Sequence, residues 1–149
     1  MANLVIMLII FILTLVNSKA ISEDPDFISK FNVHLIKNGT GQTPRLGNKV
    51  VVHYVGRFYD TGKVFDSTIE LNEPVSFILG KEEIIKCFDI VVARMSLGER
   101  IKVTCPYQLA YGVEGAGGVI PPKANLDYDI RLVHFERVIQ EKQVPKVDL

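Results

Sequence analysis

Alternating apolar and polar positions dominate the middle of the chain and predict β-strands. Five runs are rich in β-branched and aromatic residues or alternate with a period of two, at residues 31–36, 49–55, 74–79, 99–105 and 126–135. A turn at residues 60–63 leads into a further extended run, 64–66. Between residues 84 and 95 the apolar positions instead recur at helical spacing. The pattern predicts an α+β domain in which one short helix covers one face of an antiparallel sheet of about five strands.

The N-terminal segment has a different pattern. Residues 4–16 read LVIMLIIFILTLV, which is short for a membrane span but typical of the apolar region of a signal peptide. Small residues at Ser18 and Ala20 predict cleavage after Ala20, so residues 1–20 are interpreted as a signal peptide with no stable membrane insertion after cleavage. No Lys or Arg precedes the apolar run, which leaves an uncleaved anchor as the alternative.

Charge and length limit the kinds of partner and the number of domains that we expect. The 149 residues carry 17 basic and 17 acidic side chains, so no net charge draws the chain to nucleic acid, and we expect no nucleic-acid partner. The length suits one globular domain. We divide the chain after the signal peptide into an N-terminal strand and loop (21–46), the main domain (47–136) and a polar C-terminal tail (137–149).

The usual catalytic motifs are missing. His34, His53 and His134 lie far apart in strand-like runs, and no metal-ligand spacing, nucleophile motif or nucleotide-binding loop is present. We therefore expect no metal and no cofactor. What remains is a set of aromatic residues near glycine-bounded loops, which either fill the core or line a site.

Four strings decide between these alternatives: VVHYVGRFYDTGKVFDST, FILGKEEIIK, ARMSLGERIKVTCP and LAYGVEGAGGVIPPKANLDYDIRL. In this order they resemble the FKBP-type peptidyl-prolyl cis-trans isomerases over about residues 47–136. The resemblance implies a strongly twisted antiparallel sheet wrapped around a short helix, with the active site between them. It also implies isomerisation of Xaa-Pro bonds, proline-containing polypeptides as partners and the macrolides tacrolimus and rapamycin as possible ligands.

The resemblance assigns site residues position by position. Those expected to act in catalysis are Tyr54, Phe65, Asp66, Phe88, Tyr111 and Tyr128. Those expected to complete the substrate-binding pocket are Phe77, Ile84, Ile85, Val119 and Ile120. Polar ligand contacts are implied for the Asp66 carboxylate, the Ile85 backbone N–H and the Tyr111 hydroxyl.

Several positions depart from the family pattern. Phe88 stands where tryptophan is common at the pocket floor, and Leu71 and Val75 replace rim residues that are usually basic or aromatic. These departures leave two functions open. The first is an enzyme that accelerates prolyl isomerisation during folding in the secretory pathway, and the alternative is a module that binds proline peptides or a protein with little or no turnover.

Three smaller features bear on compartment and modification. Cys87 and Cys105 are the only cysteines, and they either form a disulfide in an oxidising compartment or remain two buried thiols. Asn38-Gly39-Thr40 is a glycosylation sequon in a turn-rich stretch. The C-terminal residues 146–149 resemble the retrieval signal Lys-Asp-Glu-Leu, with chance similarity as the alternative. We expect a monomer in the lumen of the endoplasmic reticulum or outside the cell.

Overall fold

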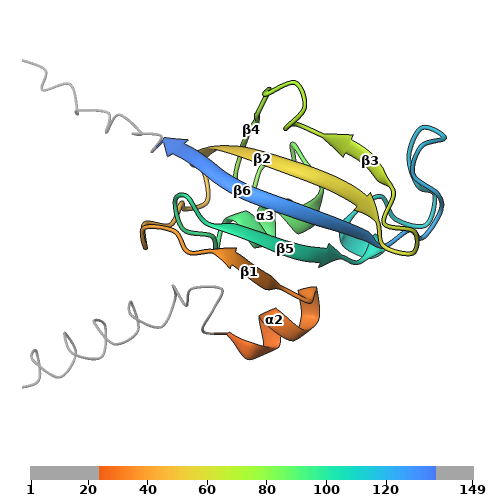
Figure 1. Cartoon of the computed structure of the whole chain (residues 1–149), viewed down its shortest axis with the longest axis horizontal. Coiled ribbons are helices and arrows are strands. Elements are labelled where there is room, and N and C mark those ends of the chain that lie inside the picture. The colour runs from red at the N-terminus through yellow and green to blue at the C-terminus, as the bar shows by residue number, and fades with distance from the viewer. Residues whose placement is uncertain (1–23, 137–149) are drawn as a thin grey trace, which may run out of the picture.

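A computed structural model describes residues 24–136 (Figure 1). Its elements in chain order are helix α2 (Pro25–Phe31), strands β1 (His34–Lys37), β2 (Lys49–Phe58), β3 (Val64–Ser67) and β4 (Val75–Ile78), helix α3 (Lys86–Val92), strand β5 (Arg100–Cys105), the 3-10 turn η2 (Tyr107–Leu109) and strand β6 (Leu126–Glu136). The predicted α+β architecture, an antiparallel sheet with a short helix against it, is confirmed, with six strands instead of about five.

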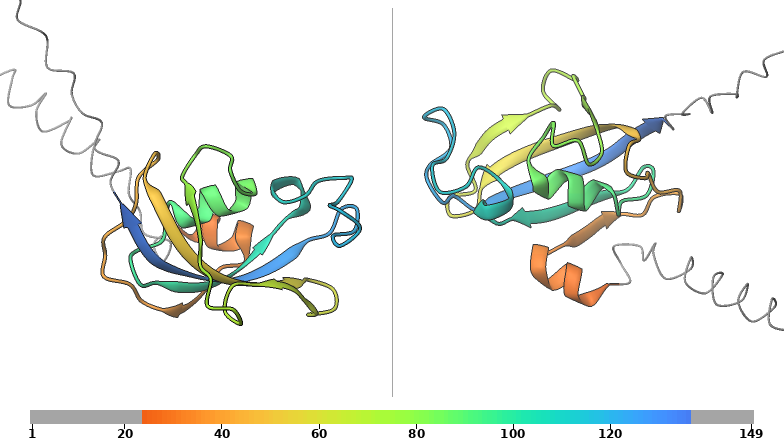
Figure 2. Two further views of the ribbon diagram at one scale, coloured as in Figure 1. Left: turned by 90° about the horizontal axis from the view of Figure 1, so that it is seen from above. Right: turned by 180° about the vertical axis from the view of Figure 1, so that it is seen from behind.

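The sheet is built around the long pair β2 and β6. Ten residue pairs join them, from Lys49 opposite Glu136 to Phe58 opposite Leu126. The strand order is β1-β5-β6-β2-β3, and β4 pairs with the first half of β2 while β3 pairs with its second half. One strand thus holds two short partners in succession, which curves the sheet (Figures 1 and 2).

The core lies between the curved sheet and α3 (Figure 2). Alternate residues of the central strands point inward and are fully buried, among them Val52 of β2, Ile101 of β5 and Ile130 of β6. From α3 and the turn after it, Val91, Val92 and Met95 pack against them with no exposed surface. Helix α3 is too short to be stable alone. Burial of its apolar face stabilises it by about 25 cal/mol for each Å² removed from water.

The helix is shorter than its apolar spacing predicts. It covers Lys86–Val92 within the expected 84–95, and Ile85 is its N-cap in an extended conformation with φ −56° and ψ 142°. After Val92 the chain continues in turns, in which the Arg94 and Met95 N–H groups donate to Val91 and Val92. Met95 is therefore buried although it lies beyond the helix.

The predicted first strand, 31–36, is wrong at its start. Phe31 ends a helix that the alternating pattern did not indicate, and the strand begins at His34. Asp24 caps the helix by accepting from the Phe27 N–H at 3.2 Å, and Asn32 ends it in the left-handed region with φ 46°. Phe27 and Phe31 are buried with ring centroids 4.8 Å apart, so aromatic packing decides in favour of the helix.

Of the two states left open for the cysteines, the structure has the disulfide. Cys87 in the first turn of α3 is bonded to Cys105 at the end of β5, with 5.8 Å between their Cα atoms, and both are buried. Cys105 shares the inward face of β5 with Ile101 and Val103, as its strand pattern predicts.

The predicted signal peptide and the C-terminal tail lie outside the described residues. Within residues 24–136 there is no helix that is both long and apolar enough to span a membrane. Asn38 directly follows β1 and is exposed, and its glycosylation stays a prediction.

Candidate functional site

Five of the predicted aromatic residues form one contiguous cluster between α3 and the sheet. Phe88 lies at its centre, with ring centroids 4.8 Å from Tyr128, 5.4 Å from Tyr54 and 6.4 Å from Phe77, all edge to face. Phe65 joins from β3, 5.9 Å from the Tyr128 ring. We call these five residues, Tyr54, Phe65, Phe77, Phe88 and Tyr128, the aromatic cluster. Such pairs stabilise one another beyond their area burial, so the cluster is a rigid apolar surface.

A glycine makes the cluster possible. Gly56 of β2 pairs with Tyr128 of β6 on one side and with Asp66 of β3 on the other. A Cβ atom at Gly56 would lie 2.7 Å from the Phe65 ring and 2.9 Å from the Tyr128 ring. Without it, both rings lie over the backbone of β2.

At the edge of the cluster, Tyr54 and Asp66 are joined by a hydrogen bond. The Tyr54 hydroxyl donates to Oδ2 of Asp66 over 2.5 Å, and Asp66 is exposed. Burial of the ring, followed by this hydrogen bond and the Asp66 charge, raises the pKa of Tyr54. The phenol therefore stays protonated, and Asp66 keeps a fixed orientation at the edge.

The hydroxyl of Tyr128 is close to that of Tyr111. Burial raises the pKa of Tyr128 most, and proximity to Tyr111 and Tyr54, a hydrogen bond with Tyr111 and the Asp66 charge raise it further. Tyr128 is only 3% exposed, whereas Tyr111 is 38% exposed. The Tyr111 side chain therefore contacts the cluster with one part and solvent with the other.

The segment before α3 supplies a backbone donor. Ile84 and Ile85 are partly buried against the core. Within the described part of the chain, the Ile85 N–H donates to no acceptor, and Ile85 lies three residues before Phe88. It is therefore available to donate a hydrogen bond to a carbonyl oxygen of a bound ligand.

The loop between η2 and β6 places its two predicted residues differently. Ala116 and Ile120 exchange two backbone hydrogen bonds of 3.0 Å each, and this turn buries Ile120 to 6% exposure. Val119 is 59% exposed, so Ile120 packs against the core and Val119 points mostly to solvent. At the rim, Leu71 is 75% exposed and Val75 packs partly against the core.

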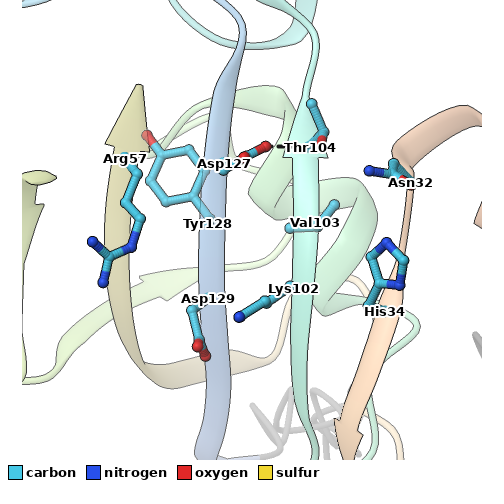
Figure 3. Close-up of a pocket in the computed structure, with 9 residues that line it drawn as sticks. All are labelled: Asn32, His34, Arg57, Lys102, Val103, Thr104, Asp127, Tyr128 and Asp129. Atoms are coloured by element: carbon cyan, nitrogen blue, oxygen red, sulfur yellow. Dashed lines mark hydrogen bonds between the residues drawn. The ribbon is translucent and has the colours of Figure 1, made fainter. Parts of the chain in front are cut away.

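A pocket of about 290 Å³ is lined mainly by outward-facing residues of the sheet and shares Tyr128 with the aromatic cluster (Figure 3). Its lining residues are Asn32, His34, Arg57, Lys102, Val103, Thr104, Asp127, Tyr128 and Asp129. Both of its carboxylates are already bonded within the sheet, since Asp127 accepts from Thr104 at 2.8 Å and Asp129 accepts two bonds from Arg100. The sequence indicated no site here. We interpret this pocket as the solvated outer face of the sheet.

Among residues 24–136, no three His, Cys, Asp or Glu side chains gather where they would hold a metal ion. The aromatic cluster presents an apolar surface, and one carboxylate, phenol hydroxyls and a backbone N–H lie at its edge. These groups can desolvate and orient a bound polypeptide.

Comparisons with known proteins agree with this geometry. The sequence profile of the family described as FKBP-type peptidyl-prolyl cis-trans isomerase matches residues 40–133. The chain is 45% identical over 105 residues to the peptidyl-prolyl cis-trans isomerase FKBP1A of Xenopus laevis, across 70% of this chain and 96% of the frog protein. It is 47% identical over 91 residues to FK506-binding protein 2 of Candida glabrata, across 61% of this chain and 67% of the yeast protein.

The fold comparison gives the same result. The structure resembles the N-terminal domain of FKBP42 from Arabidopsis thaliana with a TM-score of 0.67 and 31% sequence identity, over 70% of this chain and 85% of that one. Both the fold and the enzyme class expected from the four sequence strings are thereby confirmed. The chain belongs to the FKBP-type peptidyl-prolyl cis-trans isomerases.

Proposed function

We propose that this isomerase acts at the aromatic cluster on Xaa-Pro bonds of polypeptides that fold in the secretory pathway. The observation that carries the proposal is the juxtaposition of the buried Phe88 ring, the unbonded Ile85 N–H and the Asp66 carboxylate fixed by Tyr54. Together they offer an apolar surface for a proline ring and polar groups that orient the chain on either side of it.

The physical basis of the rate is the polarity of the imide bond. Its partial double bond makes rotation cost about 18–20 kcal/mol, and twisting the bond out of plane removes the resonance and its charge separation. The twisted bond is thus less polar than the planar one. A pocket walled by Phe88, Tyr54 and Phe65 excludes water and so favours the twisted state over the ground state.

The polar groups then orient the substrate without transferring protons. The Ile85 N–H donates to a substrate carbonyl, which fixes the chain on one side of the proline. The Tyr111 hydroxyl, held beside Tyr128, donates to a second acceptor. Asp66 accepts from Tyr54 and has lone pairs left for a substrate N–H. No nucleophile or general base is required.

Two features support the secretory pathway as the compartment. The apolar run at residues 4–16, followed by small residues up to Ala20, is typical of a signal peptide. The Cys87–Cys105 disulfide is of a kind that persists in oxidising compartments and is rare in the cytosol. Retrieval through residues 146–149 would keep the protein in the endoplasmic reticulum, and secretion is the alternative.

A proline-binding module with little turnover is the second candidate. It is favoured by the near-complete burial of Phe88 and Tyr128, at 1% and 3% exposure, because a closely packed floor leaves less depth for a proline ring. A protease-coupled assay on a Leu-Pro peptide separates the two. Release of the trans-specific product faster than in the uncatalysed reaction supports the enzyme. A peptide that binds but isomerises at the uncatalysed rate supports the module. Tacrolimus and rapamycin are proposed as competitors for the same pocket.

A further inference from the structure

The Cys87–Cys105 disulfide joins the two segments that supply opposite parts of the isomerase site. Cys87 directly precedes Phe88, the floor of the aromatic cluster, and follows Ile85 by two residues. Cys105 ends β5, and the chain runs from it through η2 to Tyr111. A covalent bond therefore connects the floor of the site to the strand from which the Tyr111 loop begins.

The segment from Cys105 to Tyr111 is held in one shape by hydrogen bonds. The Leu109 N–H donates to Pro106 at 2.9 Å, and the Gly112 N–H donates to Tyr107 at 2.8 Å. The Tyr107 N–H donates to the Asn125 side chain at 3.0 Å, which ties the turn to the start of β6. The segment that leads from Cys105 to Tyr111 is therefore a short turn of defined shape.

Apart from the packing of Phe88 in the aromatic cluster and of Ile84 and Ile85 against the core, few polar contacts hold the N-terminal end of α3. Its N-cap residue, Ile85, makes no side-chain capping bond, and the Lys86–Glu82 ion pair is 3.5 Å long between two exposed side chains. Asp89 accepts from the Gly80 N–H at 2.9 Å, which ties the helix to the loop after β4 and not to β5. The buried residues Val91 and Val92 secure the other end of the helix.

We propose that Cys87 and Cys105 are a positioning pair for the isomerase reaction: their disulfide holds Phe88 and Ile85 at a fixed place relative to Tyr111. The inference rests on the proposed function, in which these groups bind substrate. Both cysteines are 0% exposed, so protein atoms enclose the sulfur atoms on all sides. Two thiols need van der Waals separation in place of a bond of about 2 Å, so loss of the bond displaces the start of α3.

The test compares the oxidised protein with the protein reduced by dithiothreitol. The Cys87–Cys105 bond breaks, two electrons and two protons pass to the sulfurs, and the dithiol closes to its cyclic disulfide. Thiol titration confirms reduction, and far-ultraviolet circular dichroism confirms that the fold remains. We expect kcat/KM for a Leu-Pro peptide to fall about tenfold or more, because small displacements of orienting groups are costly. Amide chemical shifts of Ile85, Phe88 and Tyr111 should change, while those of β1 stay the same.

Two variants keep the test decisive. The double variant Cys87→Ala/Cys105→Val should show the lower kcat/KM without dithiothreitol and should not respond to it. Phe27→Leu, in α2, serves as a control that lowers the melting temperature while leaving kcat/KM at 10 °C unchanged. A folded reduced protein with unaltered kcat/KM and unaltered shifts at Ile85 and Phe88 would overturn the proposal. An oxidised protein without isomerase activity would refute the proposed function instead, while the shift comparison still tests the positioning role.

Discussion

The Tyr54 hydroxyl donates a 2.5 Å hydrogen bond to Oδ2 of Asp66, joining β2 to β3 at the edge of the aromatic cluster. Because Gly56 pairs with Asp66, Tyr54 lies diagonally across from Asp66, two positions earlier on β2, and its long side chain spans to the carboxylate. This bond gives the apolar site a fixed polar edge, and it defines what a substitution at Asp66 removes.

Replacing Asp66 should weaken turnover without abolishing it. Asp66→Leu removes one orienting acceptor while the aromatic rings remain, so we expect kcat/KM to fall roughly tenfold, the equivalent of about 1.4 kcal/mol. Asp127→Leu is the matched control, because Asp127 also accepts a hydrogen bond, from Thr104, but lies on the opposite face of the sheet. A folded Asp66→Leu protein with no activity at all would indicate that the carboxylate takes part in the chemistry.

Activity should be nearly independent of pH between about pH 6 and 8.5. The pKa of Tyr54 and that of Tyr128 are both raised above the ordinary tyrosine value, chiefly by burial, so both phenols stay neutral across this range. No other group is assigned a proton to transfer. A pH–rate profile with a limb near neutrality would point to acid–base catalysis.

The raised pKa values of the same two tyrosines predict that the folded state loses stability at alkaline pH. Above the ordinary tyrosine pKa of about 10, the unfolded chain releases protons that the folded state retains at Tyr54 and Tyr128. The unfolded state then binds fewer protons, so the free energy of unfolding falls as pH rises. Urea unfolding at pH 9 and pH 11 measures this, and replacing Tyr128 by Phe should reduce the difference. An identical difference in the variant would show that Tyr128 is not responsible.

Adding one methyl group at Gly56 should disturb the whole cluster. Gly56→Ala places a carbon within 3 Å of both the Phe65 and Tyr128 rings, so we expect a loss of about 1–3 kcal/mol in the free energy of unfolding and reduced kcat/KM. Its neighbour Arg57 is exposed, and Arg57→Ala should leave both quantities unchanged. Equal behaviour of the two variants in chemical denaturation would contradict the close packing over β2.

The interpretation of residues 1–20 as a signal peptide makes a simple prediction about mass. Protein recovered from the medium or the microsomal lumen should begin at Ile21, and intact-mass spectrometry reads this directly. Protein that retains Met1 and stays with the membrane fraction would favour the uncleaved anchor.

The sequence predicted best where one pattern extends over many residues. Strand β6 alternates along most of its length, and its burial follows that alternation from Leu126 to Leu132. Strand β2 was predicted from its β-branched and aromatic residues, and its burial alternates only in its first half. Helix α2 was missed because its seven residues are set by caps at Asp24 and Asn32 and by packing of Phe27 on Phe31, which a strand pattern starting at Phe31 obscured.

The site was predicted from family strings, and its internal contacts needed the structure. The Tyr54–Asp66 bond depends on the register that pairs Gly56 of β2 with Asp66 of β3, which the residue pattern of the two strands does not determine. The Cys87–Cys105 bond depends on where α3 packs against β5. The two cysteines are 18 residues apart in the sequence, and this spacing alone does not determine that packing. Val119 was expected in the pocket, but the turn that buries Ile120 leaves Val119 mostly exposed.

The most direct measurement is exchange spectroscopy by nuclear magnetic resonance on a Leu-Pro peptide at equilibrium, with catalytic amounts of the oxidised protein, in H₂O and in D₂O. Without enzyme the bond isomerises in about 10–100 s at 25 °C. If the site works by desolvation and orientation, the protein speeds the exchange well beyond that rate. The ratio of the rates in H₂O and D₂O is then about 1, because no proton is transferred. Exchange at the uncatalysed rate, with the peptide bound, would show instead that this chain holds proline segments without turning them over.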